Sequence, residues 1–369
     1  MQVKRVTISQ YKNLESVNIT LSSGFNCFVG NNGVGKTNIL DALYLLSMTK
    51  SYFSSVDSQN VRHGGDFFSV RGEYMRGDDE IEIFCSFSSS SKKVIKRGGK
   101  PYTRLSEHIG LIPLVMISPE DSELIDAGSE VRRKWLDMAI SQSNPDYLVT
   151  LMKYNKVLQH RNSLLKRFGG GVVADRSFVE VLDEQLGEFG GAVMRRREEF
   201  VADFVPIFNR YYSLISGDSE QVSLAYRPSI AGETYMDLLG ANFQRDLILG
   251  YTSVGVHRDD LLMQIGEYQI KRIGSQGQKK SYVIALKLAL YEWLHRVKGI
   301  KPLLLLDDLF DKLDSTRVEA MLRLVSGEEF GQVFITDTNR DRLERVVASL
   351  NREYKIFDVV AGEVVNGDS

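Results

Sequence analysis

Alternation between apolar and polar residues dominates the first part of the chain. Residues 3–8 and 17–21 alternate with a period of two, which is typical of half-buried strands, and a third strand is expected at 25–29. From Lys36 onward the apolar residues recur with helical spacing on one side, so a helix is expected to begin near Gly35. The pattern therefore predicts short strands that lead directly into a helix.

Further strands follow from two other patterns. Residues 66–105 alternate again and indicate an antiparallel meander with a hairpin turn at 96–100. The runs 111–117 and 302–306 are apolar throughout, which is typical of strands buried on both faces, and another strand is expected at 332–336. A sheet-based lobe is therefore expected to take in both ends of the chain.

Residues 129–245 have helical spacing instead. Glycines and one proline interrupt this region, and we expect them to separate its helices; they are residues 169–171, Gly187, 190–191 and Pro206. We therefore predict an α/β fold with an inserted helical lobe. The predicted limits are 1–128 and 246–369 for the sheet-based lobe and 129–245 for the helical lobe.

Composition narrows the class of protein. The chain has 369 residues, 43% of them hydrophobic, with 46 Lys and Arg against 48 Asp and Glu. These proportions exclude a disordered or collagen-like chain, and two cysteines are too few for a disulfide framework. The sequence shows no signal-peptide or membrane-span pattern, so a soluble cytoplasmic protein is expected. A formal charge of −2 does not by itself favour nucleic acid as a partner.

The segment from Gly30 to Thr37 fits the phosphate-binding pattern G-x-x-x-x-G-K-[ST] at every fixed position. The pattern requires a preceding strand and a following helix, and both are predicted here independently. Its glycines let backbone N–H groups surround a polyphosphate, its lysine meets the β- and γ-phosphates, and its threonine hydroxyl ligates Mg²⁺. The predicted binding residues for ATP and Mg²⁺ are Gly30, Asn31, Asn32, Gly33, Val34, Gly35, Lys36, Thr37 and Asn38.

A second nucleotide motif follows the apolar run 303–306, which ends in Asp307 and Asp308. A carboxylate at the carboxyl end of a buried parallel strand lies at the crevice where open α/β sheets bind ligands. Asp307 is therefore predicted to hold Mg²⁺, directly or through water, and Asp308 to polarise the attacking water. The predicted catalytic residues are Lys36 and Asp308. Without the first motif, an acid after a strand would more often be a helix cap.

The segment Ser275-Gln276-Gly277-Gln278 opens the helix predicted at 279–296. Alone, it is explained equally well by a capped helix start or by a second anion site. Its position after the phosphate motif and a long insert, and before the two aspartates, resembles the signature of ABC-type ATPase heads. The resemblance implies that this signature covers the γ-phosphate held by a second copy of the chain. Residues 311–314 match the D-loop of these heads, which would place Leu313 and Asp314 at the dimer seam.

Among such heads, the sequence most resembles the RecF family of bacterial recombination mediators. The shared segments cover nearly the whole chain: Tyr11-Lys12-Asn13, Gly30 to Ala42, Ser118 to Asp121, Arg132 to Asp137, Gly255 to Asp260, Ser275 to Gln278 and Leu304 to Asp308. The resemblance implies an ABC-type ATPase head with a P-loop, a mixed sheet and an antiparallel β subdomain. It also implies an ATP-dependent homodimer on duplex or gapped DNA, associated with the nucleoid. RecR and RecO would be its partners in loading RecA, in gap repair, replication-fork maintenance and SOS induction.

Several positions depart from the usual ABC pattern. Asp308 stands where transporters carry Glu, and residues 336–338 contain no His. Because Asp is one methylene shorter than Glu, we expect the attacking water to be held less well and hydrolysis to be slow, with ATP acting as a dimerisation switch. No clear Q-loop glutamine occurs between 105 and 125, and residues 279–280 are Lys-Lys where the family usually has Gln-Arg.

Two stretches of the chain are basic and free of acidic residues, one at the predicted hairpin and one on the helix after residue 146. Such runs can follow phosphates in a salt-sensitive way without reading bases, although a solvated charged face explains either run alone at least as well. The predicted DNA-binding residues are Lys92, Lys93, Lys96, Arg97, Lys100, Lys153, Lys156 and Arg161, and the same runs contain Arg104, Lys166 and Arg167.

Two other kinds of ATPase remain as alternatives. A chromosome-organising head of the SMC or Rad50 kind requires two long heptad segments, whereas the insert here is short and interrupted. A transporter ATPase subunit requires a membrane partner and usually carries the Glu and His that this chain lacks.

Overall fold

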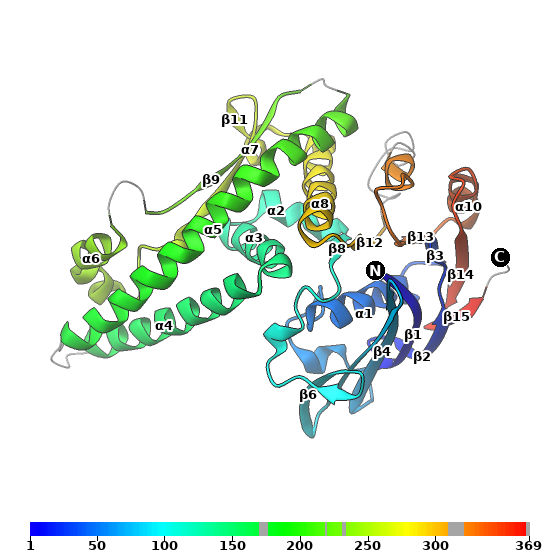
Figure 1. Cartoon of the computed structure of the whole chain (residues 1–369), viewed down its shortest axis with the longest axis horizontal. Helices are drawn as coiled ribbons and strands as arrows, with labels where there is room; N and C mark the ends of the chain where they lie inside the picture. The colour runs from blue at the N-terminus through cyan, green and yellow to red at the C-terminus, as the bar shows by residue number, and fades with distance from the viewer. Residues whose placement is uncertain (170–175, 218–219, 231–233, 309–320, 367–369) are drawn as a thin grey trace. The chain divides into compact units, whose positions relative to one another are not determined.

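The computed structural model describes residues 1–169, 176–217, 220–230, 234–308 and 321–366. Contacts between residues divide the chain into two compact units. One unit contains Met1–Asp121 and Lys280–Ser369, and the other contains Ser122–Lys279. Figure 1 shows the elements of both units along the chain.

The first unit contains a six-stranded sheet with the order β15-β14-β3-β13-β12-β8. All neighbours are parallel except β15, which pairs antiparallel with β14 at one edge. Every residue of β3, β8, β12 and β13 is buried, as expected for parallel strands covered on both faces. The predicted buried strands are thereby confirmed. Their bounds are β3 Phe25–Val29, β8 Leu114–Ile117, β12 Leu303–Leu306, β13 Val333–Asp337, β14 Tyr354–Val360 and β15 Glu363–Asn366.

A second six-stranded sheet of this unit has the order β2-β1-β4-β5-β6-β7, and its neighbours are antiparallel throughout. On β1 the side chains of Val6 and Ile8 are buried with a period of two. Val3 is buried as well, because the register shifts between Val3 and Arg5 where β1 pairs with β4. The predicted meander and its hairpin turn are confirmed. The bounds are β1 Gln2–Tyr11, β2 Leu14–Thr20, β4 Phe67–Arg76, β5 Asp79–Ser88, β6 Ser91–Arg97 and β7 Lys100–Pro101.

Helices of the first unit connect the ends of these strands. Helix α1 (Lys36–Met48) follows β3 directly, and α10 (Arg340–Ala348) lies between β13 and β14 in the chain. Helix α8 (Gln276–Lys298) begins in the second unit and continues into the first at Lys280. Short 3₁₀ segments occur at Asp57–Asn60, Leu105–Glu107 and Pro119–Ser122. No helix among the described residues is long and apolar enough to cross a membrane.

The second unit is mainly helical. Its two longest helices, α4 and α5, pack along each other, and α6 packs against both (Figure 1). A three-stranded antiparallel sheet with the order β11-β10-β9 completes the unit. The helix bounds are α2 Glu123–Asp126, α3 Ser129–Ser143, α4 Pro145–Gly169, α5 Arg176–Ser216, α6 Tyr235–Leu249 and α7 Ile270–Ile273, with a 3₁₀ turn at Val256–Arg258. The strands are β9 Val222–Arg227, β10 Asp260–Ile265 and β11 Tyr268–Gln269.

The helix breakers predicted within this unit are wrong for α5. The helix runs without interruption through Gly187, Gly190, Gly191 and Pro206. A Cβ atom at Gly190 would lie 2.5 Å from the ring of Tyr235, so this glycine permits close packing against α6 and does not end the helix. Tertiary packing therefore overrides the local preference. The predicted breaker at residues 169–171 falls largely on residues outside the described part.

The small sheet belongs to the helical unit because β9 packs on α5 and β10 packs on α3. The structure accordingly groups Ser122–Lys279 together. That the helical lobe forms a separate domain with limits at residues 129 and 245 stays a prediction.

Candidate nucleotide site

The phosphate-binding loop lies between the buried strand β3 and helix α1, as the sequence predicts. Two of its glycines cannot carry a side chain. A Cβ at Gly30 would lie 2.3 Å from the carbonyl oxygen of Val359. Gly35 has a φ of +117°, and a Cβ there would lie 2.7 Å from the side chain of Leu14. The loop is therefore closely surrounded by the strands beside it, and glycine is required at both places.

Asn13 ties the neighbouring β1–β2 turn to this loop. Its side-chain amide donates to the carbonyl of Gly33 at 2.8 Å, and its oxygen accepts from the side-chain amide of Asn38 at 2.7 Å. Reasoning from the sequence did not assign Asn13 to the site. The signal was its place in the Tyr11-Lys12-Asn13 segment shared with the RecF family.

Lys36 is 6% exposed, and its ammonium group lies against the loop itself. Its Nζ donates to the carbonyl oxygens of Gly30 at 2.7 Å and Asn31 at 2.9 Å. The amine is thus already held beside the backbone that would surround a polyphosphate. An incoming phosphate oxygen would exchange with these carbonyls as the acceptor.

Asp307 lies at the carboxyl end of β12 and is joined to the P-loop helix by a hydrogen bond. The Thr37 hydroxyl donates to Asp307 Oδ1 at 2.9 Å, and the Thr336 hydroxyl donates to the same oxygen at 2.8 Å. Burial raises the pKa of Asp307, and these two hydrogen bonds oppose that shift. The structure therefore brings together Thr37 and Asp307, the two residues predicted as Mg²⁺ ligands.

Asp308 is half-buried and follows directly, with a left-handed backbone at φ +49°. Its backbone N–H donates to the Thr336 hydroxyl at 2.9 Å. Thr336 therefore holds both aspartates, a role that the sequence did not reveal. The one feature of the sequence that pointed to Thr336 was its position near the end of β13. ABC transporters carry a His at the end of this strand.

Asp337 comes next to this cluster and is 1% exposed. Its Oδ1 accepts from Arg342 at 2.7 Å and from the backbone N–H of Asn339 at 3.0 Å. The Gly30 N–H donates to the Asp337 carbonyl at 3.3 Å. The end of β13 is thus bonded directly to the start of the P-loop.

The signature segment begins α8, and its residues cap the helix reciprocally. The Ser275 hydroxyl accepts from the Gln278 N–H at 3.2 Å, while the Gln278 side chain accepts from the Ser275 N–H at 2.7 Å. Lys279 forms an ion pair with Asp126 at 2.7 Å, so its charge is already balanced within its own unit. Gln276 and Gly277 complete the first turn. The predicted seam residues Leu313 and Asp314 lie outside the described part of the chain.

The basic run at the β6–β7 hairpin is mostly open to solvent. Lys92, Arg97, Lys100 and Arg104 are exposed, and Lys96 lies over the ring of Phe84 at 5.8 Å. Lys93 differs, because it is 15% exposed and pairs with Asp57 at 2.7 Å. The hairpin therefore presents a cationic edge from which Lys93 is largely withdrawn.

The basic run on α4 requires a correction. Lys153, Lys156, Lys166 and Arg167 are exposed, but Arg161 is fully buried and pairs with Asp183 at 2.6 Å and Asp246 at 2.7 Å. The prediction that Arg161 binds DNA is wrong. Its helical spacing from the buried residues Tyr154, Val157 and Leu165 indicates the inward face of α4, which the charge count did not consider.

Two motifs of the helical unit hold its helices together. Arg132 forms a bidentate pair with Asp260 at 2.6 and 3.1 Å, and Arg133 donates to the Asp259 carbonyl at 2.6 Å. Arg197, which is 1% exposed, pairs with Asp137 at 2.8 Å and with Asp259 at 2.9 Å. Its burial makes Arg197 part of the core of this unit.

His257 also has a structural place in this unit. The Tyr154 hydroxyl lies 2.7 Å from Nδ1, and Nε2 lies 2.9 Å from the Thr252 carbonyl. Donation from Nε2–H to that carbonyl leaves Nδ1 as an acceptor, which is the neutral tautomer. Burial lowers the pKa of His257 to about 4, in agreement with a neutral ring.

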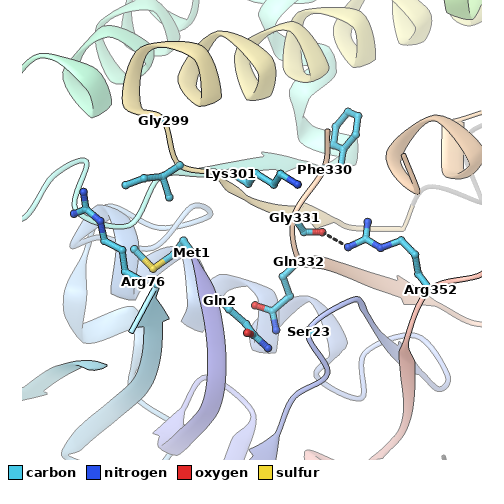
Figure 2. Close-up of a pocket in the computed structure, with 12 residues that line it drawn as sticks. Met1, Gln2, Ser23, Arg76, Gly299, Lys301, Phe330, Gly331, Gln332 and Arg352 are labelled. Atoms are coloured by element: carbon cyan, nitrogen blue, oxygen red, sulfur yellow. Dashed lines mark hydrogen bonds between the residues drawn. The ribbon is translucent and has the colours of Figure 1, made fainter. Parts of the chain in front are cut away.

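A pocket of about 460 Å³ opens at the amino ends of β3, β12, β13 and β14, the edge opposite the P-loop. Figure 2 shows Arg352 donating to the Gly331 carbonyl there, at 2.7 Å. Lys301, also in this pocket, donates to the Glu328 carbonyl. These two cations already hold backbone carbonyls, so we assign nucleotide binding to the P-loop edge and not to this pocket.

Comparison with known proteins shows the family to which the chain belongs. The RecF/RecN/SMC N terminal domain model matches residues 2–363. The chain is 49% identical over 366 residues to the DNA replication and repair protein RecF of Phocaeicola vulgatus, covering 99% of this chain and 98% of that protein. It is 45% identical to the protein of the same name from Flavobacterium johnsoniae, covering 97% of this chain and 100% of that protein.

Solved structures resemble the chain over its full length. One is the structure of the recombination mediator protein RecF with ATP, described as part of the RecFOR pathway. It superposes on this chain with a TM-score of 0.90 at 31% sequence identity, and the match covers 100% of this chain and 98% of that chain. The RecF-ATPrS structure gives 0.89 at 30% identity, with 99% and 98% covered. An SMC head bound to the C-winged helix domain of ScpA gives 0.59 at 17% identity, which is a likeness of fold alone. The predicted ABC-type ATPase head is confirmed.

Proposed function

The chain belongs to the RecF family, and from that premise we propose that it is an ATP-dependent DNA clamp acting in recombinational repair and at replication forks. The RecF–ATP and RecF-ATPrS structures, which it resembles over nearly its whole length, support ATP as the nucleotide. The observation that carries the proposal is the Thr37–Asp307 hydrogen bond, which joins two motifs 270 positions apart into one site.

ATP binds at the P-loop in this proposal. The backbone N–H groups from Gly30 to Lys36 surround the phosphates, and the positive end of the α1 dipole faces them. Lys36 turns from the loop carbonyls to the β- and γ-phosphates. Asn13 holds the loop in shape through the Gly33 carbonyl, and Asn38 donates to the side-chain oxygen of Asn13.

The donor set at Thr37 and Asp307 fits Mg²⁺. Both groups offer oxygen, which this hard cation prefers, and the two oxygens already lie 2.9 Å apart. The buried carboxylate of Asp307 has a raised pKa, so a cation beside it would offset the cost of its charge. When bound, Mg²⁺ would neutralise phosphate charge, while the chain's own residues hold the nucleotide in place.

The exposed start of the signature segment supports dimerisation in this proposal. By resemblance to ABC-type heads, Ser275, Gln276, Gly277 and Gln278 of a second copy cover the γ-phosphate. The exposed Ser275 and Gln276 begin a helix whose N-terminal N–H groups favour an anion. ATP would therefore close two copies on DNA, and hydrolysis would release them.

Asp308 would polarise the attacking water, with Lys36 stabilising charge on the transferred phosphate. The Thr336 hydroxyl fixes the Asp308 backbone, so the short side chain has little freedom to approach the water. Slow turnover is expected from this arrangement, in keeping with ATP as a switch more than a source of energy.

DNA contacts are proposed at the two basic runs, without base reading. Lys92, Lys96, Arg97 and Lys100 supply one, and exposed residues of α4 such as Lys153 and Lys156 supply the other. By family resemblance, RecR and RecO are the protein partners, RecA is loaded on gapped DNA, and SOS induction follows. The RecFOR pathway named for the similar structures supports these partners.

Light scattering with a non-hydrolysable ATP analogue tests the nucleotide switch. The wild-type chain should dimerise with the analogue and stay monomeric with ADP, and Lys36→Ala should stay monomeric with both. Lys92→Ala, at an exposed residue outside the nucleotide site, is the matched control and should dimerise normally. A wild-type chain that remains monomeric with the analogue would overturn the proposal.

Titration of gapped duplex DNA at several salt concentrations tests the DNA surface. Each lost phosphate contact should reduce the slope of log affinity against log salt by about 0.9. Lys92→Ala and Lys153→Ala should each do so. Lys93→Ala, whose charge pairs with Asp57, should change the slope less. Equal, negligible effects of all three variants would remove these runs from the DNA surface.

A further inference from the structure

The chain leaves the first unit after Asp121 and returns to it at Lys280. Lys287 lies about two helical turns after this return, on α8, and is 2% exposed. Its Nζ lies 2.5 Å from Asp121 Oδ1 and donates to the Met116 carbonyl at 2.9 Å. A buried ion pair therefore joins the segment that leaves the unit to the helix that re-enters it.

Tyr52 is the third member of this cluster. Its hydroxyl donates to Asp121, and Lys287 Nζ lies 3.3 Å from the same hydroxyl. Burial, followed by the Asp121 charge, raises the pKa of Tyr52 well above its ordinary value, so the phenol remains a donor. Asp121 also accepts from the Ser118 N–H at 2.7 Å. The buried carboxylate thus has three kinds of donor, as a buried charge requires.

One branch of this cluster reaches the P-loop helix. The Tyr52 N–H donates to Asp41 at 2.7 Å, and Asp41 lies about one turn after Lys36 and Thr37 on α1. Asp41 is fully buried, and Lys12 Nζ pairs with it at 2.6 Å. Tyr52 therefore connects the two buried carboxylates, one on the P-loop helix and one at the exit to the helical unit.

A second branch reaches the Asp307 side of the nucleotide site. Ser118, which donates to Asp121, directly follows Ile117 at the end of β8. The Ile117 carbonyl accepts from the Asp307 N–H at 2.8 Å. Asp121 is therefore connected to three places. Tyr52 links it to the P-loop helix, Ser118 and Ile117 link it to Asp307, and Lys287 links it to α8.

We propose that Asp121, Lys287 and Tyr52 are positioning residues that set α8, and with it the signature segment at its start, according to the state of the nucleotide site. The inference rests on the proposed function, because it concerns the regulation of ATP-driven dimerisation. Helix α8 is continuous from Gln276 to Lys298, so Lys287 and the signature segment belong to the same helix. The hydrogen bonds and ion pairs described for these three side chains go to Asp121, Met116, Ser118 and one another, outside the phosphate-binding loop, so we expect ATP binding itself to be retained without them.

Lys287→Met tests the inference, since it keeps the length of the side chain and removes its charge. The variant should bind a fluorescent ATP analogue with near wild-type affinity, while its ATP-dependent dimerisation, measured by analytical ultracentrifugation, weakens about tenfold or more. Arg296→Met is the matched control on the same helix, because Arg296 is 61% exposed and the ion pair described for it lies along the helix, with Glu292. It should dimerise like the wild type.

A second variant keeps the test decisive where Lys287→Met fails to fold, because that substitution leaves the buried charge of Asp121 without its partner Lys287. Asp121→Asn combined with Lys287→Met removes both charges and should restore folding but not dimerisation. A folded variant of either kind that dimerises with wild-type affinity overturns the inference. If the wild-type chain itself does not dimerise with ATP, the proposed function fails instead, and the two failures are thereby distinguished.

Discussion

Thr37 and Asp307 are joined by a hydrogen bond of 2.9 Å although they lie 270 positions apart in the chain. Thr336 donates to the same carboxylate oxygen at 2.8 Å. One oxygen of a buried aspartate is thus held from the P-loop helix on one side and from a neighbouring strand on the other. The hydrogen bond from Thr37 to this oxygen joins the phosphate-binding motif to the motif that ends β12.

Thr37→Val removes the hydroxyl and nearly preserves the volume of the side chain. We expect ATP affinity in the presence of Mg²⁺ to fall by about tenfold, a loss of roughly 1.4 kcal/mol, because the variant lacks one of the two proposed metal ligands. Isothermal titration with Mg²⁺ and with EDTA should show the loss only with Mg²⁺. Thr37→Ser, which keeps the hydroxyl, is the control. An equal loss in EDTA would mean that Thr37 acts on the nucleotide without the metal.

Asp308→Asn removes the charge that would polarise water. Asn tolerates the left-handed backbone at this position, where φ is +49°, so the fold should be kept. We expect ATP turnover to fall by about 10²-fold while the ATP-bound dimer persists longer. Phosphate release and light scattering measure the two effects. Unchanged turnover would assign the role of general base to another residue.

Arg161→Met breaks a buried arrangement of one arginine and two aspartates. Because Asp183 and Asp246 would keep their charges without this partner, the free energy of unfolding should fall by about 3–5 kcal/mol. Urea denaturation followed by circular dichroism measures the change. Lys156→Met on the exposed face of α4 is the control and should stay within about 0.5 kcal/mol of the wild type. A similarly small change for Arg161→Met would contradict its structural role.

We expect the free energy of unfolding to fall in acid because His257 is buried in its neutral form. Burial lowers its pKa in the folded protein from 6.5 to about 4, so the unfolded chain binds a proton first as the pH falls. The stabilising contribution is complete above pH 6.5 and is lost on acidification through pH 4, by up to about 3 kcal/mol. Melting temperatures between pH 4 and 7 should show this slope. His257→Gln should flatten it, and an identical slope in the variant would refute the assignment.

Much of the site could be predicted because its parts are local. The change from two-residue to helical spacing places β3 before Gly30 and α1 after it, and the spacing of the phosphate motif defines the loop between them. The run that ends in Asp307 likewise predicts a buried strand. Each of these patterns is carried by neighbouring residues, so the sequence alone determines them.

Burial of charge was decided by tertiary structure. Arg161 and Lys153 belong to the same basic run, yet one is enclosed by two aspartates from other helices and the other is exposed. The uninterrupted α5 is similar, since Gly190 is used for close packing against Tyr235. The number of charged or helix-breaking residues along the chain does not show which side chains of distant segments will pack against them.

The sequence by itself therefore determined the phosphate-binding loop, the buried strands and the family of the chain, because periodicity and motif spacing are properties of contiguous residues. Only the tertiary structure decided that Thr336 holds both aspartates and that Asp121 pairs with Lys287. The physical reason is that a buried polar group is stable only with its partners in place, and those partners come from segments that the fold alone brings together.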